Sequence, residues 1–183
     1  MRLFTALDLP PDLVRKLEDF PLRLPPAPDI HWSPAANLHI TTKFIGEWPE
    51  SRLAELKRVL AAMPPAPPVP VRIRRVAFFP SAPAPRVFVC GVEAPGLPEL
   101  AAATGAAAAS LGIPAETRPY SPHLTLARIR GQAHVQALGV AIAALASLEI
   151  GRFEARSFFL YQSVLQSSGS VYTKLAEFPL TKS

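Results

Sequence analysis

Two apolar stretches of the chain each contain a histidine and a threonine two residues apart. They are LHITTKFIG, Leu38–Gly46, and PHLTLARI, Pro122–Ile129. Both are rich in the branched and aromatic residues that favour β-strands. Successive side chains of a strand point to opposite faces, so each histidine should share a face with its threonine. The intervening residues of the first stretch, Ile40, Thr42 and Phe44, are expected on the other face.

The two stretches are related by a constant offset. His39 and His123 are 84 residues apart, and so are Thr41 and Thr125. The same offset relates predicted strands at 2–8 and 86–92, with Phe4 on Phe88, helices at 50–63 and 134–147, and strands at 71–79 and 155–163. This pattern predicts an internal duplication. We therefore expect an α+β fold of two pseudo-symmetric lobes, each an antiparallel-rich sheet backed by helices, with the active-site cleft between them.

The remaining pattern completes a single domain over residues 1–183, with repeats at about 1–80 and 85–165. Apolar residues at helical spacing predict further helices at 12–20 and 97–111, the second ending at Gly112. A short extended piece is expected at 30–32. Strands at 152–163 and 171–178 are predicted to form a C-terminal hairpin within 152–179.

Composition adds the cellular setting. Apolar residues make up 49% of the 183, which is enough for a sizeable core, and the one cysteine, Cys90, excludes an internal disulfide. We expect Cys90 to be a buried core residue. The net charge of +5 favours polyanionic ligands such as RNA. The first apolar run is too short for a signal peptide and is interrupted by Asp8, so a cytoplasmic location is expected.

Paired imidazoles and hydroxyls suit acid–base chemistry on a phosphate. A histidine titrates near neutral pH, so one of a pair can accept a proton while the other donates one. Threonine hydroxyls beside them can donate hydrogen bonds to the phosphate oxygens. Neither motif contains a carboxylate or a cysteine, so no metal ligand set is expected. The sequence also lacks the G-x-S-x-G and Walker motifs.

These residues resemble the bacterial and archaeal RNA 2′,3′-cyclic phosphodiesterases, also called 2′-5′ RNA ligases, of the two-histidine phosphoesterase superfamily. The resemblance runs nearly end to end. It rests on RLFTALDLP, NLHITTKFIGEWPE, RVFVCGV, RPYSPHLTLARIR and FFLYQSVLQSSGSVYTKLAEFPL. The paired H-x-T-x motifs, with a TLAR-type extension on the second, are its most specific part.

The resemblance implies hydrolysis of a terminal 2′,3′-cyclic phosphate of RNA to a 2′-phosphate, without metal or cofactor. It gives His123 the role of proton acceptor from water and His39 that of proton donor to the leaving O3′. Thr41 and Thr125 would hold the phosphate. An RNA 5′-hydroxyl in place of water would give a 2′-5′ linkage without ATP. RNA is thus the expected partner; no membrane contact or obligate protein partner is expected, and a monomer is the default.

Four further residues are candidates for contacting the substrate. Lys43 has the parity of His39 and Thr41, although a solvated strand-end lysine is an equal alternative. Arg128 is favoured by the resemblance, but it has the opposite parity to His123 and reaches the site only if the strand bulges or ends there. Tyr120 is expected either to stack on a base or to pack under its loop. Phe4 is expected to line the site or to lie in the core.

Two alternative functions stay open at this point. One is a phosphodiesterase for small cyclic nucleotides or for ADP-ribose cyclic phosphate, which uses the same chemistry on a smaller substrate. The other is a non-catalytic protein that binds RNA ends. Turnover of substrates of different size separates the first, and histidine substitutions separate the second.

Overall fold

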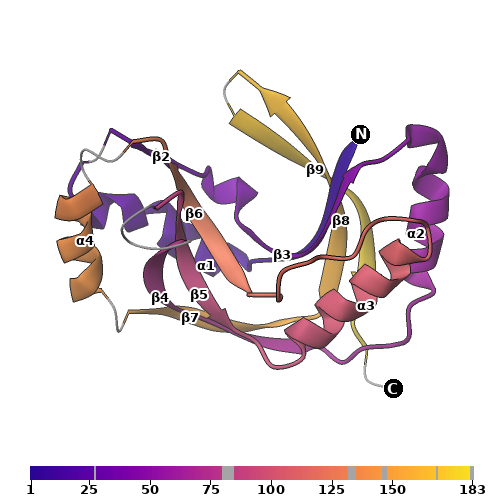
Figure 1. The fold of residues 1–183 in the computed structure, drawn as a ribbon. Coiled ribbons are helices and arrows are strands. Elements are labelled where there is room, and N and C mark those ends of the chain that lie inside the picture. The colour runs from indigo at the N-terminus through magenta and orange to yellow at the C-terminus, as the bar shows by residue number, and fades with distance from the viewer. Residues whose placement is uncertain (27, 80–84, 132–134, 146–147, 168, 182–183) are drawn as a thin grey trace.

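The structure is a computed structural model of the 183-residue chain, and it describes all residues except 27, 80–84, 132–134, 146–147, 168 and 182–183. Its strands form two sheets, seen side by side in Figure 1. The strands are β1 (Arg2–Asp8), β2 (Ile30–Trp32), β3 (His39–Glu47), β4 (Val69–Phe79), β5 (Val87–Glu93), β6 (His123–Ile129), β7 (Glu149–Ala155), β8 (Ser157–Gln166) and β9 (Gly169–Pro179). The α-helices are α1 (Pro11–Glu18), α2 (Leu53–Ala61), α3 (Leu97–Ala109) and α4 (Val135–Ala144). Short 3-10 turns lie at Phe20–Arg23, Ala35–Asn37 and Glu50–Arg52.

Every strand pair in the two sheets is antiparallel. The first sheet has the order β3-β1-β8-β9 and the second the order β2-β6-β5-β4-β7. The predicted α+β class with two antiparallel sheets is therefore confirmed. Each sheet holds one of the two His-x-Thr strands, β3 at an edge of the first and β6 inside the second.

Each sheet takes strands from both halves of the chain. The first sheet joins β1 and β3 to the C-terminal hairpin β8–β9, and the second joins β5, β6 and β7 to β2 and β4. The two sheets nevertheless have equivalent strand orders. β1 lies between β3 and β8 in the first sheet, and β5 lies between β6 and β4 in the second. The sheets thus do not coincide with the continuous repeats at 1–80 and 85–165, and that division stays a prediction about the sequence.

The segment expected to be one strand at 152–163 is two strands, so this prediction was wrong. The chain leaves β7 in the second sheet and enters β8 in the first at Arg156, which lies between the two strands. Only β8 pairs with β9, and the hairpin therefore begins at Ser157. The only residue between the two strands is Arg156, and no glycine or proline marks the change of sheet there. Figure 1 shows the hairpin projecting beyond the rest of the first sheet.

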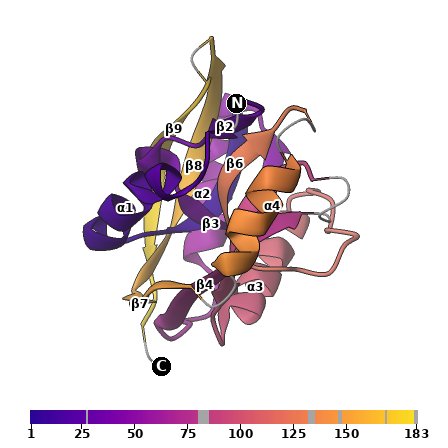
Figure 2. The same ribbon diagram turned by 90° about the vertical axis from the view of Figure 1, so that its left-hand side faces the viewer.

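Helices cover one side of each sheet. Helix α3 packs against β3 and α2 packs against α3 and β9, while α1 contacts β7 and lies with α4 beside the second sheet (Figures 1 and 2). Helix α3 buries Leu97, Leu100, Ala101, Thr104 and Ala108 at helical spacing, which is why this alanine-rich stretch is stable as a helix. Gly112, at φ +85°, ends its last turn as expected. Among the described residues, no helix is long and apolar enough to cross a membrane.

Candidate active site

The two His-x-Thr strands contact each other between the sheets. Their histidines are held in the same way. His39 Nδ1 lies 2.7 Å from the carbonyl oxygen of Asn37, and His123 Nδ1 lies 2.8 Å from that of Ser121. A carbonyl oxygen only accepts, so each Nδ1 carries the hydrogen. Each Nε2 is therefore the ring nitrogen that can exchange a proton with a substrate.

Both strands carry a β-bulge one residue after the threonine. Along β3, Thr41 pairs with Ala6 and Lys43 with Thr5, so Thr42 is the extra residue. Along β6, Thr125 pairs with Val89 and Ala127 with Phe88, which makes Leu126 the extra residue. The bulges fall at equivalent places in the two motifs, because Thr42 and Leu126 are 84 residues apart.

The bulge in β6 turns Arg128 onto the face of His123 and Thr125. The three pair with Val87, Gly91 and Val89 of β5, which alternate along one face of that strand. Arg128 was expected to reach the site only if its strand bulges or ends there, and β6 has such a bulge. His31, in the edge strand β2, is exposed and pairs with Arg128, so it lies on this face as well.

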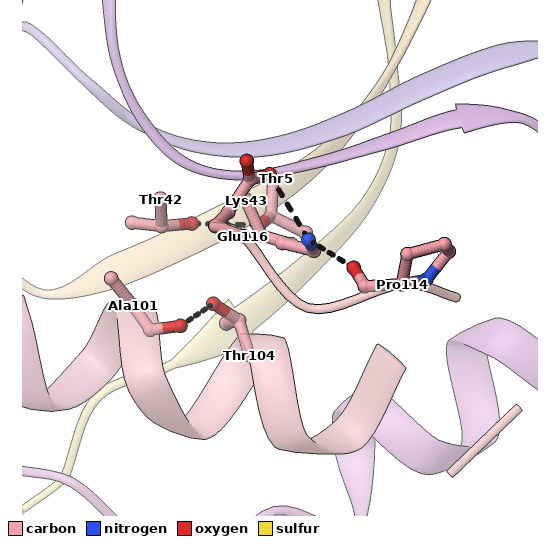
Figure 3. A network of polar contacts seen from close by, with 7 residues as sticks. All are labelled: Thr5, Thr42, Lys43, Ala101, Thr104, Pro114 and Glu116. Carbon is pink, nitrogen blue, oxygen red and sulfur yellow. Dashed lines mark hydrogen bonds and ion pairs between the residues drawn. The ribbon is translucent and has the colours of Figure 1, made fainter. Parts of the chain in front are cut away.

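The bulge in β3 has the opposite consequence for Lys43. Because Thr5 and Ala6 face opposite sides of β1, Lys43 and Thr41 do too. The expectation that Lys43 shares the face of His39 was wrong. The expectation that Phe44 lies on the opposite face from His39 was also wrong. Lys43 is 4% exposed, and its Nζ donates to Pro114 O at 2.9 Å and Glu116 Oε1 at 3.0 Å (Figure 3). Phe44 is 58% exposed and pairs with Phe4 on the His39 side.

The register also corrects the first-strand alignment. Thr41 and Thr125 are equivalent, and they pair with Ala6 and Val89, so β1 and β5 are offset by 83 residues, from 6 to 89. Phe4 is consequently not equivalent to Phe88. Phe88 is fully buried among the rings of Phe20, Trp32 and Phe78.

Phe4 belongs to an aromatic group around His39. Its ring centroid lies 4.7 Å from the imidazole, 5.3 Å from Tyr161 in a stacked arrangement and 5.1 Å from Tyr172. Tyr172 also meets His39 edge-on at 5.2 Å. Phe4 is only 3% exposed, so it supports the imidazole from below and has little surface to offer a substrate.

A carboxylate accompanies these rings. Asp8 is the cross-strand partner of His39. One of its oxygens accepts a short hydrogen bond from the Tyr161 hydroxyl, and the other an ion pair from Lys174 Nζ at 2.6 Å. The Lys174 ammonium in turn lies 3.7 Å from the centre of the Phe159 ring. The C-terminal hairpin therefore supplies both rings and charge to the surroundings of His39.

Burial lowers the pKa of His39 below its usual value of 6.5. The hydrogen bond to Asn37 and the charge of Asp8 oppose this effect, and the positive charge of His123 adds to it. In the absence of a ligand, His39 is therefore mostly neutral at pH 7. The charge of His123 acts on the pKa of His39, and β3 and β6 are in contact, so the two imidazoles are near enough to interact.

The surroundings of His123 are more open. The residue is exposed, and the ring of Phe79, at the end of β4, stacks on its imidazole with centroids 6.0 Å apart and an angle of 12°. Phe79 is itself 46% exposed. An exposed ring parallel to an imidazole beside a basic residue is a suitable surface for a nucleobase.

Tyr120 lies at the junction of the two lobes. Its hydroxyl donates to the carbonyl oxygen of Thr41 at 2.8 Å, across from the segment that precedes β6. The ring is half-buried and packs against the core, and burial raises the pKa of its hydroxyl. Of the two alternatives left by the sequence, packing under the loop describes this position.

Other reactive groups lie apart from this arrangement. Cys90 is fully buried, and burial raises the pKa of its thiol to about 12, which makes a thiolate nucleophile unfavourable there. Within the part of the chain that the structure describes, no three His, Cys, Asp or Glu side chains are grouped so as to hold a metal ion.

Sequence reasoning missed the residues that surround the motifs: Asp8, Tyr161, Tyr172, Lys174 and Phe79. The hairpin residues reach His39 through the pairing of β8 with β1, which joins strands about 150 residues apart and leaves no local signal. Asp8 had a signal, since it ends the predicted strand that precedes the first motif.

The chain is similar to known proteins over most of its length. A sequence model of the family described as LigT-like phosphoesterase matches residues 7–89 and 92–172. A protein of Thermus thermophilus named RNA 2′,3′-cyclic phosphodiesterase is 33% identical over 190 aligned positions, which cover 98% of this chain and 90% of that one. One of the same name from Methanocaldococcus jannaschii is 29% identical over 177, covering 97% and 99%.

Solved structures give the same result. The crystal structure of TT0787 of Thermus thermophilus superposes with a TM-score of 0.83 at 30% identity, over 98% of both chains. That of E. coli LigT in complex with 3′-AMP does so with a TM-score of 0.81 at 25% identity, over 99% of this chain and 98% of that one. The matched family covers most of the chain, including both His-x-Thr strands. The protein belongs to the LigT-like phosphoesterase family of the two-histidine superfamily.

Proposed function

We propose that the protein hydrolyses the terminal 2′,3′-cyclic phosphate of RNA to a 2′-phosphate. The observation that carries the proposal is the matched pair of histidines. Each fixes its Nδ1 hydrogen on a backbone carbonyl, each leaves Nε2 for proton transfer, and each has a threonine on the same face of its strand. Relatives of about 30% identity carry the name RNA 2′,3′-cyclic phosphodiesterase, which supports this substrate.

The proposed reaction needs one proton acceptor and one donor. Nε2 of His123 takes a proton from water as the water oxygen bonds to phosphorus. The bond from phosphorus to O3′ breaks, and O3′ takes the proton of His39 Nε2. The hydroxyls of Thr41 and Thr125 donate to the non-bridging oxygens, where negative charge develops. Solvent then returns a proton to His39 and removes one from His123.

His39 must be protonated when the substrate is bound, although burial favours its neutral form in the free protein. The negative charge of the bound phosphate would favour the protonated form of His39, since an anion beside an imidazole raises its pKa. Asp8 acts in the same direction. The donor is thus charged by the substrate itself, which protects the free protein from carrying an unpaired buried cation.

Arg128 and Phe4 are proposed to support this site. Arg128, on the His123 face of β6, would pair with phosphate oxygens through its guanidinium. Phe4 would act below His39 by fixing the imidazole plane. Lys43 is not proposed to contact the substrate, because the bulge in β3 places it on the opposite face, where it bonds to Pro114. Tyr120 is not proposed to do so either, because its hydroxyl is bonded to Thr41 O.

The same geometry permits ligation if a 5′-hydroxyl of RNA replaces water as the nucleophile. Nothing in this step requires ATP, because the energy of the strained cyclic phosphate drives it. Independence of metal is part of the proposal as well, since both proton transfers are assigned to imidazoles. The cytoplasmic location expected from the sequence stays a prediction.

Turnover of two substrates tests the proposal. A short RNA ending in a 2′,3′-cyclic phosphate and a cyclic mononucleotide are each incubated with the protein in EDTA, and the position of the product phosphate is determined. We expect the RNA to be converted to a 2′-phosphate with the higher kcat/KM. Turnover of the mononucleotide alone would favour a small-substrate phosphodiesterase instead. Loss of activity in EDTA, restored by added metal, would contradict the metal-free reaction.

A binding measurement separates an enzyme from a protein that merely holds RNA ends. The affinity of a 2′-phosphorylated RNA is measured for the natural protein and for His123→Ala. If binding is tight but no cyclic phosphate is opened by the natural protein, the catalytic proposal is wrong and the RNA-end binder remains. A matched control is Arg156→Met, an exposed arginine between β7 and β8 that pairs with Glu154.

A further inference from the structure

The segment that leads into β6 is fastened to β3 at two points. This α3–β6 loop, residues 110–122, follows helix α3 and ends at the residue before His123. Its Pro114 and Glu116 accept hydrogen bonds from Lys43 Nζ at 2.9 and 3.0 Å. Further along the same loop, Tyr120 donates to Thr41 O at 2.8 Å.

The first fastening is costly to break. Lys43 is 4% exposed, and a buried ammonium without hydrogen-bond acceptors is strongly unfavourable. Its carboxylate partner, Glu116, is 59% exposed, so the buried lysine is the member of the pair that depends more on this contact. Figure 3 shows the Lys43 side chain reaching Pro114 and Glu116 of this loop.

The second fastening uses the free edge of a sheet. β3 is the outermost strand of its sheet, so some of its backbone carbonyls have no neighbouring strand to bond. The Tyr120 hydroxyl satisfies that of Thr41, the residue whose side chain is proposed to hold the phosphate. The contact therefore joins the first motif directly to the residue three positions before His123.

The loop also holds the second imidazole. Ser121, next to Tyr120, provides the carbonyl that accepts from His123 Nδ1 at 2.8 Å. A continuous series of contacts thus runs from Thr41 through Tyr120 and Ser121 to His123. A shift of the loop would move the His123 ring relative to the first motif.

We infer that Lys43 and Tyr120 are positioning residues that set the placement of His123 relative to His39, and that neither contacts the substrate. The inference rests on the proposed function for its catalytic consequence. A displacement of about 1 Å at a reacting group costs on the order of 10²-fold in rate. Tyr120→Phe should therefore lower kcat by about tenfold to a hundredfold with KM changed less than about twofold, and Lys43→Met should do the same.

Two substitutions serve as matched controls. Ser110→Ala removes a hydroxyl-to-carbonyl bond of 2.7 Å, to Ala107, at the start of the same loop. Arg52→Met removes an exposed ion pair of 2.7 Å with Glu55. Both should leave kcat and KM unchanged. A substrate-contact role for Lys43 or Tyr120 would instead raise KM or weaken binding of 2′-phosphorylated RNA.

A double-mutant cycle tests whether Tyr120 acts through His123. With His123→Ala already present, Tyr120→Phe should cost little more, because the ring that it positions is gone. Equal losses in both backgrounds would overturn the inference. So would unchanged kcat in Tyr120→Phe, which keeps the ring and should fold even if Lys43→Met does not.

Hydrogen–deuterium exchange gives a measurement that does not depend on activity. Residues 113–122 and the first residues of β6 should lose protection in Tyr120→Phe and in Lys43→Met, but not in Ser110→Ala. If the natural protein fails to open cyclic phosphates, the proposed function is wrong, and exchange still decides the inference. Unchanged protection of this segment in both variants would overturn it.

Discussion

The two histidines sit in matched backbone settings but in different surroundings. Each imidazole donates from Nδ1 to the backbone carbonyl two residues earlier, and each motif is followed by a β-bulge at the same position. His39, however, is half-buried between Phe4 and Tyr172, with Asp8 as its cross-strand partner. His123 is exposed and has Phe79 stacked on it.

The difference shows how a repeated motif can take two roles. Two imidazoles in identical environments would have the same pKa, and neither would be favoured as acid or base. Different environments divide acid and base roles between like groups in enzymes. Here burial lowers the pKa of His39. The backbone orients both imidazoles in the same way. The hairpin β8–β9 contributes side chains around His39, and this contribution makes the surroundings of the two histidines differ.

The largest expected effect comes from removing either imidazole. His39→Ala and His123→Ala should each lower kcat on cyclic-phosphate RNA by about 10²- to 10⁴-fold, since each removes one proton transfer. The double variant should lose little beyond the more damaging single one, because the two act in one step. Single-turnover rates measure this. Full activity in either variant would remove that histidine from the mechanism.

Arg128 tests the consequence of the bulge in β6. Arg128→Met should raise KM by roughly tenfold to a hundredfold, as expected for the loss of a hydrogen bond to a charged group. The position that corresponds to it after the β3 bulge is Phe44, which has no charge, so Phe44→Ala should change KM much less. Steady-state kinetics of both variants decide this. A larger effect at Phe44 would mean that the phosphate lies toward the first sheet.

The bulge in β3 contains a buried pair of hydroxyl groups and the bulge in β6 does not, so the contribution of this pair to stability can be tested. Thr42 is pinned by a buried 2.7 Å hydrogen bond between its hydroxyl and that of Thr5, whereas the equivalent Leu126 and Phe88 are apolar. Thr42→Val should reduce the free energy of unfolding by about 1–3 kcal/mol, because it leaves the Thr5 hydroxyl buried without its partner.

The double variant Thr5→Val with Thr42→Val converts the first bulge to the apolar type of the second. It should be more stable than the sum of the single changes predicts, since no hydroxyl is then left unpaired. Urea denaturation measures all three variants. Additive losses would show that the hydroxyl pair does not hold the bulge.

The smallest effect concerns the charge beside His39. The pKa of His39 is lowered by burial, so in the free protein its proton is lost as the pH rises through a value below 6.5. Since kcat/KM reports the free protein, it should fall with rising pH earlier than kcat does. Asp8→Asn removes a charge that raises this pKa, and should move the fall in kcat/KM to still lower pH.

At pH 7 this change should reduce kcat/KM by about two- to fivefold, the size of a partly exposed charge interaction. Glu177→Gln, a change of the same charge at an exposed position of β9, is the control and should leave the profile in place. If the fall at high pH stays in place and the rise at low pH moves to lower pH instead, His39 is the proton acceptor.

Much of the site was predictable because it is local. Spacing within a strand placed His39 with Thr41 and His123 with Thr125, and the constant offset paired the two motifs. Parity failed beyond the threonines, at Lys43 and Phe44, because one extra residue reverses the side chains that follow it and a bulge has no simple sequence signal.

The strand that carries each motif, the helices between them and the duplicated His-x-Thr pair could be predicted from the sequence. They depend on periodicity and on residue types close together in the chain. The surroundings of each histidine, in contrast, depend on how distant segments pack together. Tyr161 and Tyr172 reach His39 through the pairing of β8 with β1, and Tyr120 reaches Thr41 across the lobes. These contacts join segments far apart in the sequence, where the choice of partner strand depends on the energy of the whole fold and not on any local pattern.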